Sequence, residues 1–348
     1  MSVTTFKALV ARESSGGAVV RSIEQRSIDD LPEGDVLIRV HYSSLNYKDG
    51  LSATGNRGVT RLYPHTPGID AAGIVEQSSS ASFRPGDRVI VTGYELGSNA
   101  DGGWAGFIRV PSDWIVPLPE GLSLRESMIL GTAGFTAGLS VHKLLHYGVE
   151  PGQGPVVVTG ATGGVGCLAV AILARRGYHV SAVTGKHDAH PFLRALGASE
   201  ILTRDQCLDT TGRALLARRW AGAVDTVGGP FLDSIVRQIN NEGAVACCGN
   251  ITAPDLRTSI YPFILRGVAL LGINSAFTPM ATRQSIWKEL SGGWKPSELN
   301  SLSRECRLEE LDPSITAILN GAITGRVLIN LLPSPPSPLF GTTVESRS

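Results

Sequence analysis

An apolar strand followed by a glycine-rich turn and a helix start constrains this 348-residue chain more than any other feature. Residues 156–166 carry small residues at positions 161, 163 and 166, in the spacing of a dinucleotide-binding turn with alanine in place of the first glycine. Gly163 would let the backbone approach a pyrophosphate, and Gly166 would let the helix pack closely on the strand. Because a helix N-terminus presents free N–H groups, we expect a dinucleotide site here rather than a purely structural turn.

The end of the next strand indicates which dinucleotide is bound. Proteins that bind NAD hold the ribose 2′-hydroxyl with an Asp or Glu about 20 residues past the turn. This chain has Thr184, Gly185 and Lys186 there, and the first acid, Asp188, comes later. A hydroxyl and an ammonium group suit a 2′-phosphate, which a carboxylate would repel, so we expect NADPH. The alternative is that Lys186 is an ordinary solvated lysine.

Turn signals and hydrophobic patterns divide the chain into segments of different character. Residues 1–125 alternate short β-branched runs with Pro and Gly turns, which is typical of a small barrel or sandwich. Residues 126–275 alternate helices, the first broken at 131–134, with apolar strands, and predict a doubly wound parallel sheet of the α/β class. Residues 276–332 are expected to return to the first domain. The segment 333–348 begins with four prolines in six residues, which predicts a disordered tail.

Charge, hydropathy and cysteine usage exclude several classes of partner. The chain has 31 Lys+Arg and 31 Asp+Glu, so no bulk charge favours nucleic acid or an anionic membrane. We find no apolar run of the roughly 18 residues that a membrane span needs, and no secretion signal at the start. The five cysteines lack the spacing of a zinc knuckle. We therefore expect a cytoplasmic protein with reduced thiols that acts on a small molecule.

Several short motifs, spread over residues 1–332, together resemble one family. They lie at 43–50, 67–70, 131–137, 159–166, 220–228 and 262–266. On these motifs the chain resembles the NADPH-dependent acrylyl-CoA reductases, in the zinc-free, quinone-oxidoreductase-like branch of the medium-chain dehydrogenase/reductase superfamily. The resemblance implies a barrel-like, GroES-like catalytic domain that is interrupted by a Rossmann domain, which agrees with the segment order above. It also implies a homodimer, with residues 270–273 as a candidate edge strand.

The resemblance further implies a set of cofactor contacts. These fall on Tyr47, Thr132, Thr162, Gly163, Gly164, Val165, Thr184, Gly185, Lys186, Arg204, Asn250, Ile264 and Ser275. Lys186 stands where relatives often have arginine, which keeps the charge but loses the bidentate fork. Zinc-dependent relatives place a cysteine near position 46 and a His-Glu pair where this chain has Ile69-Asp70, so we expect no metal.

The implied reaction reduces acrylyl-CoA to propionyl-CoA. Hydride from NADPH adds to the β-carbon, negative charge develops on the thioester oxygen, and a proton is added at the α-carbon. We name Asn46, Tyr47 and Asp49 as catalytic candidates, because they follow a strand at the position where relatives line the nicotinamide cleft. Tyr47 could orient the nicotinamide or relay a proton, or it could only pack under the cofactor. Asp49 could instead cap the following helix.

Basic residues after this motif are candidates for binding coenzyme A. Arg57, Arg61 and Lys48 could meet its phosphates, or they could form a solvated loop. Tyr63 is another candidate proton donor. Two other functions stay open at this point. One is a reductase of quinones or 2-alkenals with the same cofactor, and the other is a non-catalytic NADPH-binding sensor.

Overall fold

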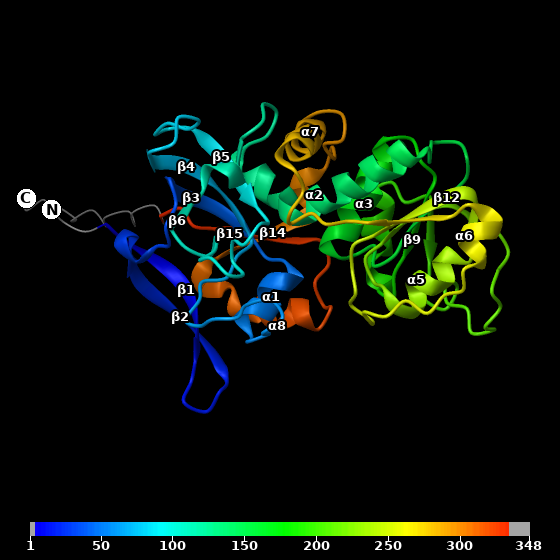
Figure 1. Cartoon of the computed structure of the whole chain (residues 1–348), viewed down its shortest axis with the longest axis horizontal. Coiled ribbons are helices and arrows are strands. Elements are labelled where there is room, and N and C mark those ends of the chain that lie inside the picture. Colours follow the sequence, from blue (N-terminus) through cyan, green and yellow to red (C-terminus); the bar gives the residue numbers. More distant parts are fainter. Residues whose placement is uncertain (1–3, 334–348) are drawn as a thin grey trace, which may run out of the picture.

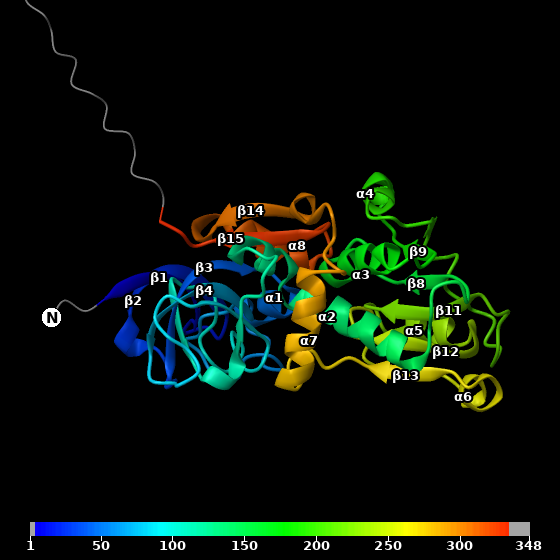
Figure 2. The same cartoon turned by 90° about the horizontal axis from the view of Figure 1, so that it is seen from above.

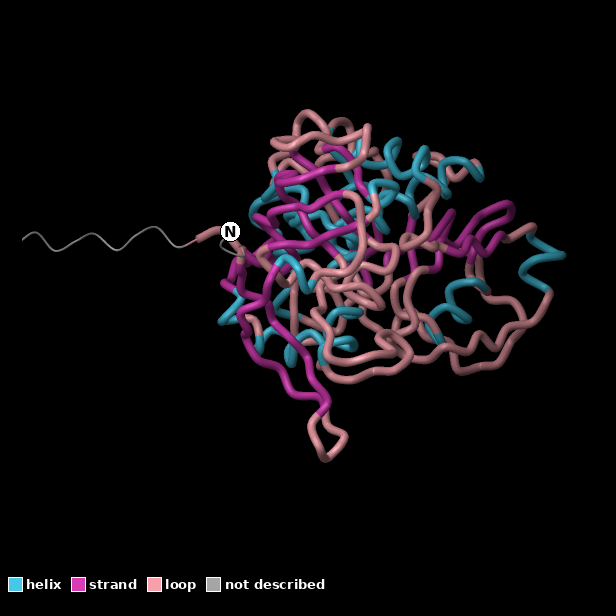
Figure 3. Tube along the Cα trace, turned by 60° about the vertical axis from the view of Figure 1, so that its left-hand side comes forward, coloured by secondary structure: helices cyan, strands magenta, loops and turns pink. Residues whose placement is uncertain are grey.

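The structure is a computed structural model that describes residues 4–333. One large sheet lies in each half of the molecule (Figure 1, Figure 2). The first is mainly antiparallel and has the order β14-β15-β3-β4-β5-β7, with β6 paired to β3, and a β1–β2 hairpin projects beside it (Figure 3). These strands are β1 (Thr5–Glu13), β2 (Val19–Ser27), β3 (Val36–Ser44), β4 (Asp70–Ser78), β5 (Arg88–Thr92), β6 (Phe107–Val110), β7 (Ile115–Pro117), β14 (Ser303–Arg307) and β15 (Arg326–Asn330).

The second sheet is parallel throughout and has helices on both faces, as the alternating pattern predicts. Its order is β10-β9-β8-β11-β12-β13, so the strand before the glycine-rich turn, β8, lies in the middle and β13 lies at an edge. Its strands are β8 (Val156–Val158), β9 (Val180–Val183), β10 (Glu200–Leu202), β11 (Trp220–Asp225), β12 (Ile239–Cys247) and β13 (Ala269–Gly272). Its helices are α3 (Gly164–Arg175), α4 (His190–Ala195), α5 (Gly229–Val236) and α6 (Tyr261–Arg266).

Helix α2 (Leu124–Tyr147) joins the two halves, packing against β3 and β4 of one sheet and α3 and β12 of the other. By length and composition it could cross a membrane. Our expectation that no apolar run is long enough was therefore wrong, although most of α2 is buried inside the protein. Gly131, with φ 51° and ψ −155°, breaks the helix within the interval that the sequence predicts.

The last part of the chain packs against the first half. Helix α7 (Met280–Ser291) packs on α2, and α8 (Asp312–Leu319) packs on α1 (Tyr47–Ala53). Strand β15 then pairs antiparallel with β3, so that Leu328 lies opposite Ser44. The predicted tail lies, apart from Pro333, outside the described residues. Because β3 and β15 pair in the first sheet, the end of β3 and the start of β15 both lie next to the glycine-rich turn of the second, parallel sheet.

Candidate active site

The turn after β3 is fixed by a capping box at the start of α1. Asn46 is the N-cap residue, and its backbone N–H donates to Asp49 Oδ2 at 2.8 Å. The other oxygen of Asp49 accepts the backbone N–H of Ile69 at 2.7 Å, which ties the turn to the start of β4. Asp49 is fully buried. The capping role considered for Asp49 is therefore present in the structure, while its catalytic role stays a prediction.

Asp49 is also an unusual carboxyl group. Burial, and next the negative charge of Asp70, raise its pKa to about 7, although hydrogen bonds from Ile69 and Asn46 oppose this shift. A carboxyl with such a pKa exchanges its proton near neutral pH. No substrate can reach it without displacing the residues that bury it, so this proton is held inside the wall of the site.

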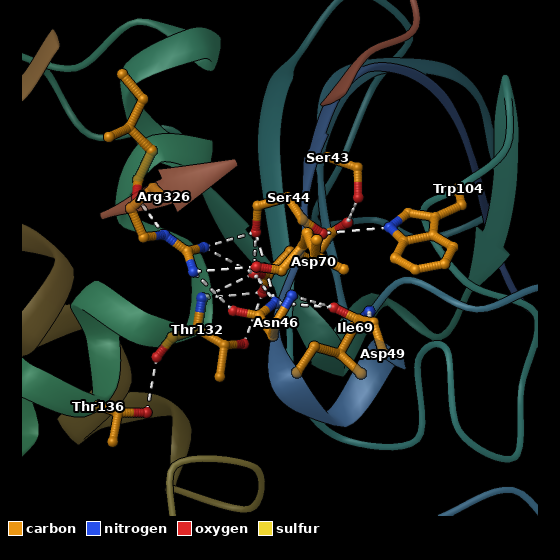
Figure 4. Close-up of polar contacts among 12 residues, drawn as sticks. Ser43, Ser44, Asn46, Asp49, Ile69, Asp70, Trp104, Thr132, Thr136 and Arg326 are labelled. Carbon is orange, nitrogen blue, oxygen red and sulfur yellow. Dashed lines mark hydrogen bonds and ion pairs between the residues drawn. The ribbon is translucent and has the colours of Figure 1, made fainter. Parts of the chain in front are cut away.

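A second carboxylate, Asp70 at the start of β4, lies at the centre of a buried network (Figure 4). Its oxygens accept the backbone N–H of Thr132 at 2.9 Å and the hydroxyls of Thr132 and Ser44 at 2.6 and 2.5 Å. Asn46 Nδ2 donates to it at 2.8 Å. The N–H of Thr132 is free because the helix breaks at Gly131, so Asp70 accepts from the first turn of the second part of α2.

Arg326, the first residue of β15, balances this charge from the other side. Its Nη2 donates to Ser44 Oγ at 2.8 Å and lies 3.9 Å from Asp70 Oδ2, and its Nη1 donates to Asn46 Oδ1 at 3.1 Å. The side chain is buried, and Nε donates to the carbonyl of Ile129 at 2.9 Å. Our sequence analysis missed Asp70 and Arg326 as site residues. The available signal in both cases was a charged residue at the start of a strand, followed directly by apolar or small residues.

Tyr47 differs from the other two catalytic candidates. Both amide hydrogens of Asn46 are used, toward Asp49 and Asp70, and its oxygen accepts from Arg326. Tyr47 is 36% exposed, and its hydroxyl has no hydrogen-bond partner among the residues that the structure describes. Of the three candidates, Tyr47 is therefore the one that can offer a free polar group to a bound molecule.

The glycine-rich turn has the geometry of a phosphate cradle. Gly163 is the N-cap of α3, and the turn follows β8 directly. A Cβ at Gly166 would lie 2.3 Å from the carbonyl oxygen of Gly160, so only glycine lets α3 approach the strand this closely. The backbone N–H groups at the start of α3 are free to bind an anion. The residues present therefore fit a dinucleotide pyrophosphate, with Thr162, Gly163, Gly164 and Val165 around it.

Two cations lie near each other, Lys186 after β9 and Arg204 after β10. Arg204 packs against Gly185, where a Cβ would be 3.0 Å from its Nε. Lys186 donates to the carbonyl of Ile323 at 2.7 Å, and burial together with the charge of Arg204 lowers the pKa of Lys186. Lys186 lines a groove of about 830 Å³ between the two halves, which Arg304 also lines. Like charges held together at a groove suit a doubly charged 2′-phosphate.

The remaining predicted cofactor contacts are distributed unevenly. Thr184 is buried, with its hydroxyl 3.5 Å from that of Thr162. Asn250 packs its backbone against Gly228, and the carbonyl of Ser275 accepts from Arg283. Ile264 is 62% exposed on α6. Arg266 of the same helix contacts the start of β12, whereas the glycine-rich turn lies at the other end of the parallel strands, after β8. The structure does not bring Ile264 together with the other residues.

The basic loop after α1 is partly committed to other contacts. Arg57 donates to Glu13 at 2.8 Å and to the carbonyl of Arg61 at 2.7 Å, and its guanidinium lies over the ring of Tyr63. The Tyr63 hydroxyl donates to the carbonyl of Ser52. The side chains of Arg61 and, in part, Lys48 are exposed.

The position of the zinc ligands in zinc-dependent relatives does not fit a metal in this chain. An amide, an aliphatic side chain and a carboxylate that already accepts several hydrogen bonds stand there, at Asn46, Ile69 and Asp70. Zinc prefers three or four thiolate, imidazole or carboxylate ligands. Within residues 4–333, no group of three His, Cys, Asp or Glu side chains is placed to hold a metal ion.

Comparison with known proteins gives matches along most of the chain. The family described as "Alcohol dehydrogenase GroES-like domain" matches residues 32–120, and the family described as "Zinc-binding dehydrogenase" matches residues 164–291. YhfP of Bacillus subtilis, named as a quinone oxidoreductase, is 47% identical over 94% of this chain and 99% of its own. The acrylyl-CoA reductase AcuI of Ruegeria pomeroyi is 43% identical over 94% of this chain and 99% of its own.

Solved structures agree with these matches. The YhdH oxidoreductase of Salmonella enterica, crystallised in complex with NADP, is 43% identical and superposes with a TM-score of 0.91 over 94% of this chain and 100% of its own. The crystal structure of YhfP, with NAD bound, is 47% identical and superposes with a TM-score of 0.92 over the same shares. The predicted fold, a GroES-like domain interrupted by a Rossmann domain, is confirmed.

Proposed function

The chain belongs to the acrylyl-CoA reductase family of the medium-chain dehydrogenase/reductase superfamily, and we propose that it reduces acrylyl-CoA to propionyl-CoA. It is an oxidoreductase, and its cofactor is NADPH. The observation that carries the proposal is that the dinucleotide cradle is held, through Gly325 and Arg326, against the turn that carries the partially exposed phenol of Tyr47. Two relatives at 43% and 44% identity are named as acrylyl-CoA reductases.

The cofactor supplies the hydride, so the protein has to align the enoyl group and supply a proton. Hydride addition at the β-carbon forms a carbon–hydrogen bond and moves the electrons of the double bond onto the thioester oxygen. Protonation at the α-carbon then completes the saturated product. Tyr47 is our candidate for donating to the developing enolate or for relaying that proton, because its hydroxyl is free. Asn46 and Asp49 support the turn that holds Tyr47.

A specific observation favours a second candidate, a quinone or 2-alkenal reductase. Arg57 already pairs with Glu13 and covers Tyr63, so Arg61 and Lys48 are the parts of the basic loop left for the phosphates of coenzyme A. YhfP, named as a quinone oxidoreductase, is also 47% identical. Quinones and alkenals undergo the same hydride transfer and need no cationic site.

The two functions are separated by following NADPH oxidation with a panel of acceptors. We expect kcat/KM for acrylyl-CoA to exceed that for acrolein and for a simple quinone by at least about a hundredfold, with crotonyl-CoA between them. The proposal would be overturned by equal or higher kcat/KM with quinone or acrolein. Arg61→Ala should raise KM for acrylyl-CoA alone, whereas Lys7→Ala, at an exposed ion pair with Glu309, should not.

We also propose a homodimer in the cytoplasm. Apolar side chains are exposed around the edge strand β13 and the neighbouring α6, which is the kind of surface that a second copy covers. They are Ile251, Ile260, Tyr261, Ile264, Leu265 and Leu270. The five cysteines are all free, which fits a reducing compartment.

A further inference from the structure

Four consecutive residues, 323–326, run from the turn after α8 into β15 and contact both the glycine-rich turn and the turn that carries Tyr47. We propose that the last of them, Arg326, is a positioning residue that holds the glycine-rich turn against the turn that carries Tyr47. The inference rests on the proposed function only for the identity of the reaction. The inference goes beyond the proposed function because it assigns the alignment of cofactor and acceptor to Arg326, which touches neither molecule in our proposal.

Contacts on the cofactor side are contributed by each part of this segment. Lys186 donates to the carbonyl of Ile323 at 2.7 Å, next to the groove that we assign to the 2′-phosphate. The N–H of Gly325 donates to the carbonyl of Thr162 at 2.9 Å, within the phosphate loop. Arg326 lies against Gly164, where a Cβ would come within 2.9 Å of its Nη1. The start of β15 is therefore seated on the loop that holds the pyrophosphate.

Contacts on the other side come from the guanidinium of Arg326. Nη1 donates to Asn46 Oδ1, the N-cap side chain of α1, and Nη2 donates to Ser44 Oγ at the end of β3 (Figure 4). Nε donates to the carbonyl of Ile129, just before the break in α2. One planar group thus joins β3, α1 and α2, while its stem contacts the start of α3.

This arrangement matters for hydride transfer because the reaction depends on a short and well-aligned approach of donor and acceptor carbons. A displacement of about 1 Å can lower the rate about a hundredfold. Lysine at position 326 would keep the positive charge near Asp70. A single ammonium group could not, however, donate to Ser44, Asn46 and Ile129 at the same time as the planar guanidinium does. We therefore expect Arg326→Lys to change the alignment of the glycine-rich turn with the Tyr47 turn more than it changes the charge balance.

The test measures kcat, KM and NADPH binding separately in Arg326→Lys. We expect kcat to fall about 10- to 100-fold, while KM for the acceptor and Kd for NADPH each change by less than about threefold. Ser44→Ala, which removes one acceptor of the guanidinium and one donor to Asp70, should lower kcat about 3- to 10-fold in the same way. It serves as the second variant if Arg326→Lys does not fold.

The matched control is Arg237→Lys. Arg237 is also buried and pairs with two carboxylates, Asp209 and Asp233, but it lies between α5 and β12, and among the described residues its hydrogen bonds do not include the turn that carries Tyr47. The substitution Arg237→Lys should lower Tm without changing kcat per folded molecule. The proposal would be overturned if Arg326→Lys and Ser44→Ala both kept the wild-type kcat, or if their loss of kcat matched the loss of folded protein. Each variant is assayed with every acceptor that the wild type reduces, so failure with acrylyl-CoA alone counts against the proposed substrate and not against this role.

Discussion

Asp70 and Arg326 are buried charges, so the site depends on how completely their hydrogen bonds are satisfied. Asp70 accepts from Thr132, Ser44 and Asn46, and Arg326 donates to four protein groups, including Asn46. Removing one partner of such a buried pair leaves a charge without compensation, which typically costs about 3–5 kcal/mol. This is why conservative changes are the useful probes at these positions.

Asp49 predicts a specific pH dependence. Its pKa is raised from the usual 3.8 to about 7, so the folded protein binds more protons than the unfolded chain between these values. The contribution of Asp49 to stability is therefore lost as the pH rises from about 4 to about 7. Asp49→Asn does not titrate, so its Tm should fall less than the wild-type Tm between about pH 4 and pH 7. Differential scanning fluorimetry measures both slopes, and identical slopes would show that Asp49 ionises normally.

Lys186 predicts the choice between the two nicotinamide cofactors. Lys186→Ala removes one of two cations from the groove, so Kd for NADPH should rise about tenfold or more while Kd for NADH stays nearly constant. Fluorescence titration gives both constants. Lys295→Ala, which removes a lysine paired with Glu126 outside the groove, should change neither. An equal rise in both constants would mean that Lys186 supports the fold and does not read the 2′-phosphate.

Among secondary-structure elements, α2 has the most demanding backbone. Gly131 has a positive φ, and a Cβ there would lie 2.5 Å from Asp70 Oδ2 and 3.0 Å from Arg326 Nη2. Gly148, the C-cap of the same helix, also has a positive φ but has open space around it. Local backbone freedom and side-chain packing can therefore be separated within one helix.

The corresponding prediction compares alanine at these two glycines. Gly148→Ala should lose about 1 kcal/mol from the free energy of unfolding, because only the left-handed conformation opposes alanine. Gly131→Ala should lose at least about 2 kcal/mol more, because it also displaces the buried network. Urea midpoints measure the order. Equal losses would show that the network moves aside at little cost.

The sequence predicted elements better than it predicted the site. The phosphate loop could be found because Gly166 has a strictly local reason, the close approach of a helix to the strand before it. The break in α2 was also visible from its glycines. The network around Asp70 could not be predicted, because it joins β3, β4, α2 and β15 across long sequence separations. For the same reason, Asn46 was named for chemistry when its side chain is occupied by Asp49, Asp70 and Arg326.

At the scale of the whole molecule, the exposed apolar surface around β13 predicts the assembly state. We expect a mass of about twice 36.7 kDa by light scattering at micromolar concentration. Leu270→Glu, at the edge strand, should shift the mass toward the monomer. Val20→Glu places the same charge on an exposed valine of the β1–β2 hairpin and should leave the mass unchanged. A monomeric wild type would remove the dimer from the account.

The order of segments along the chain also determines where chemistry can occur. Because β15 pairs with β3, and Gly325 just before it donates to Thr162 in the glycine-rich turn, the last segment holds the two halves together at this point. The exact alignment of the halves depends on side chains such as Arg326, which hydrophobic patterns do not reveal.

The central claim, hydride transfer from NADPH to the β-carbon of an acrylyl thioester, is tested most directly by isotope labelling. The enzyme is given acrylyl-CoA with NADPH carrying deuterium at either face of C4, and the propionyl-CoA formed is analysed by mass spectrometry and NMR. We predict one deuterium at the β-carbon from one of the two labelled cofactors, and a solvent-derived hydrogen at the α-carbon. Propionyl-CoA without cofactor deuterium from either label, or no propionyl-CoA while a quinone is reduced, would contradict the account.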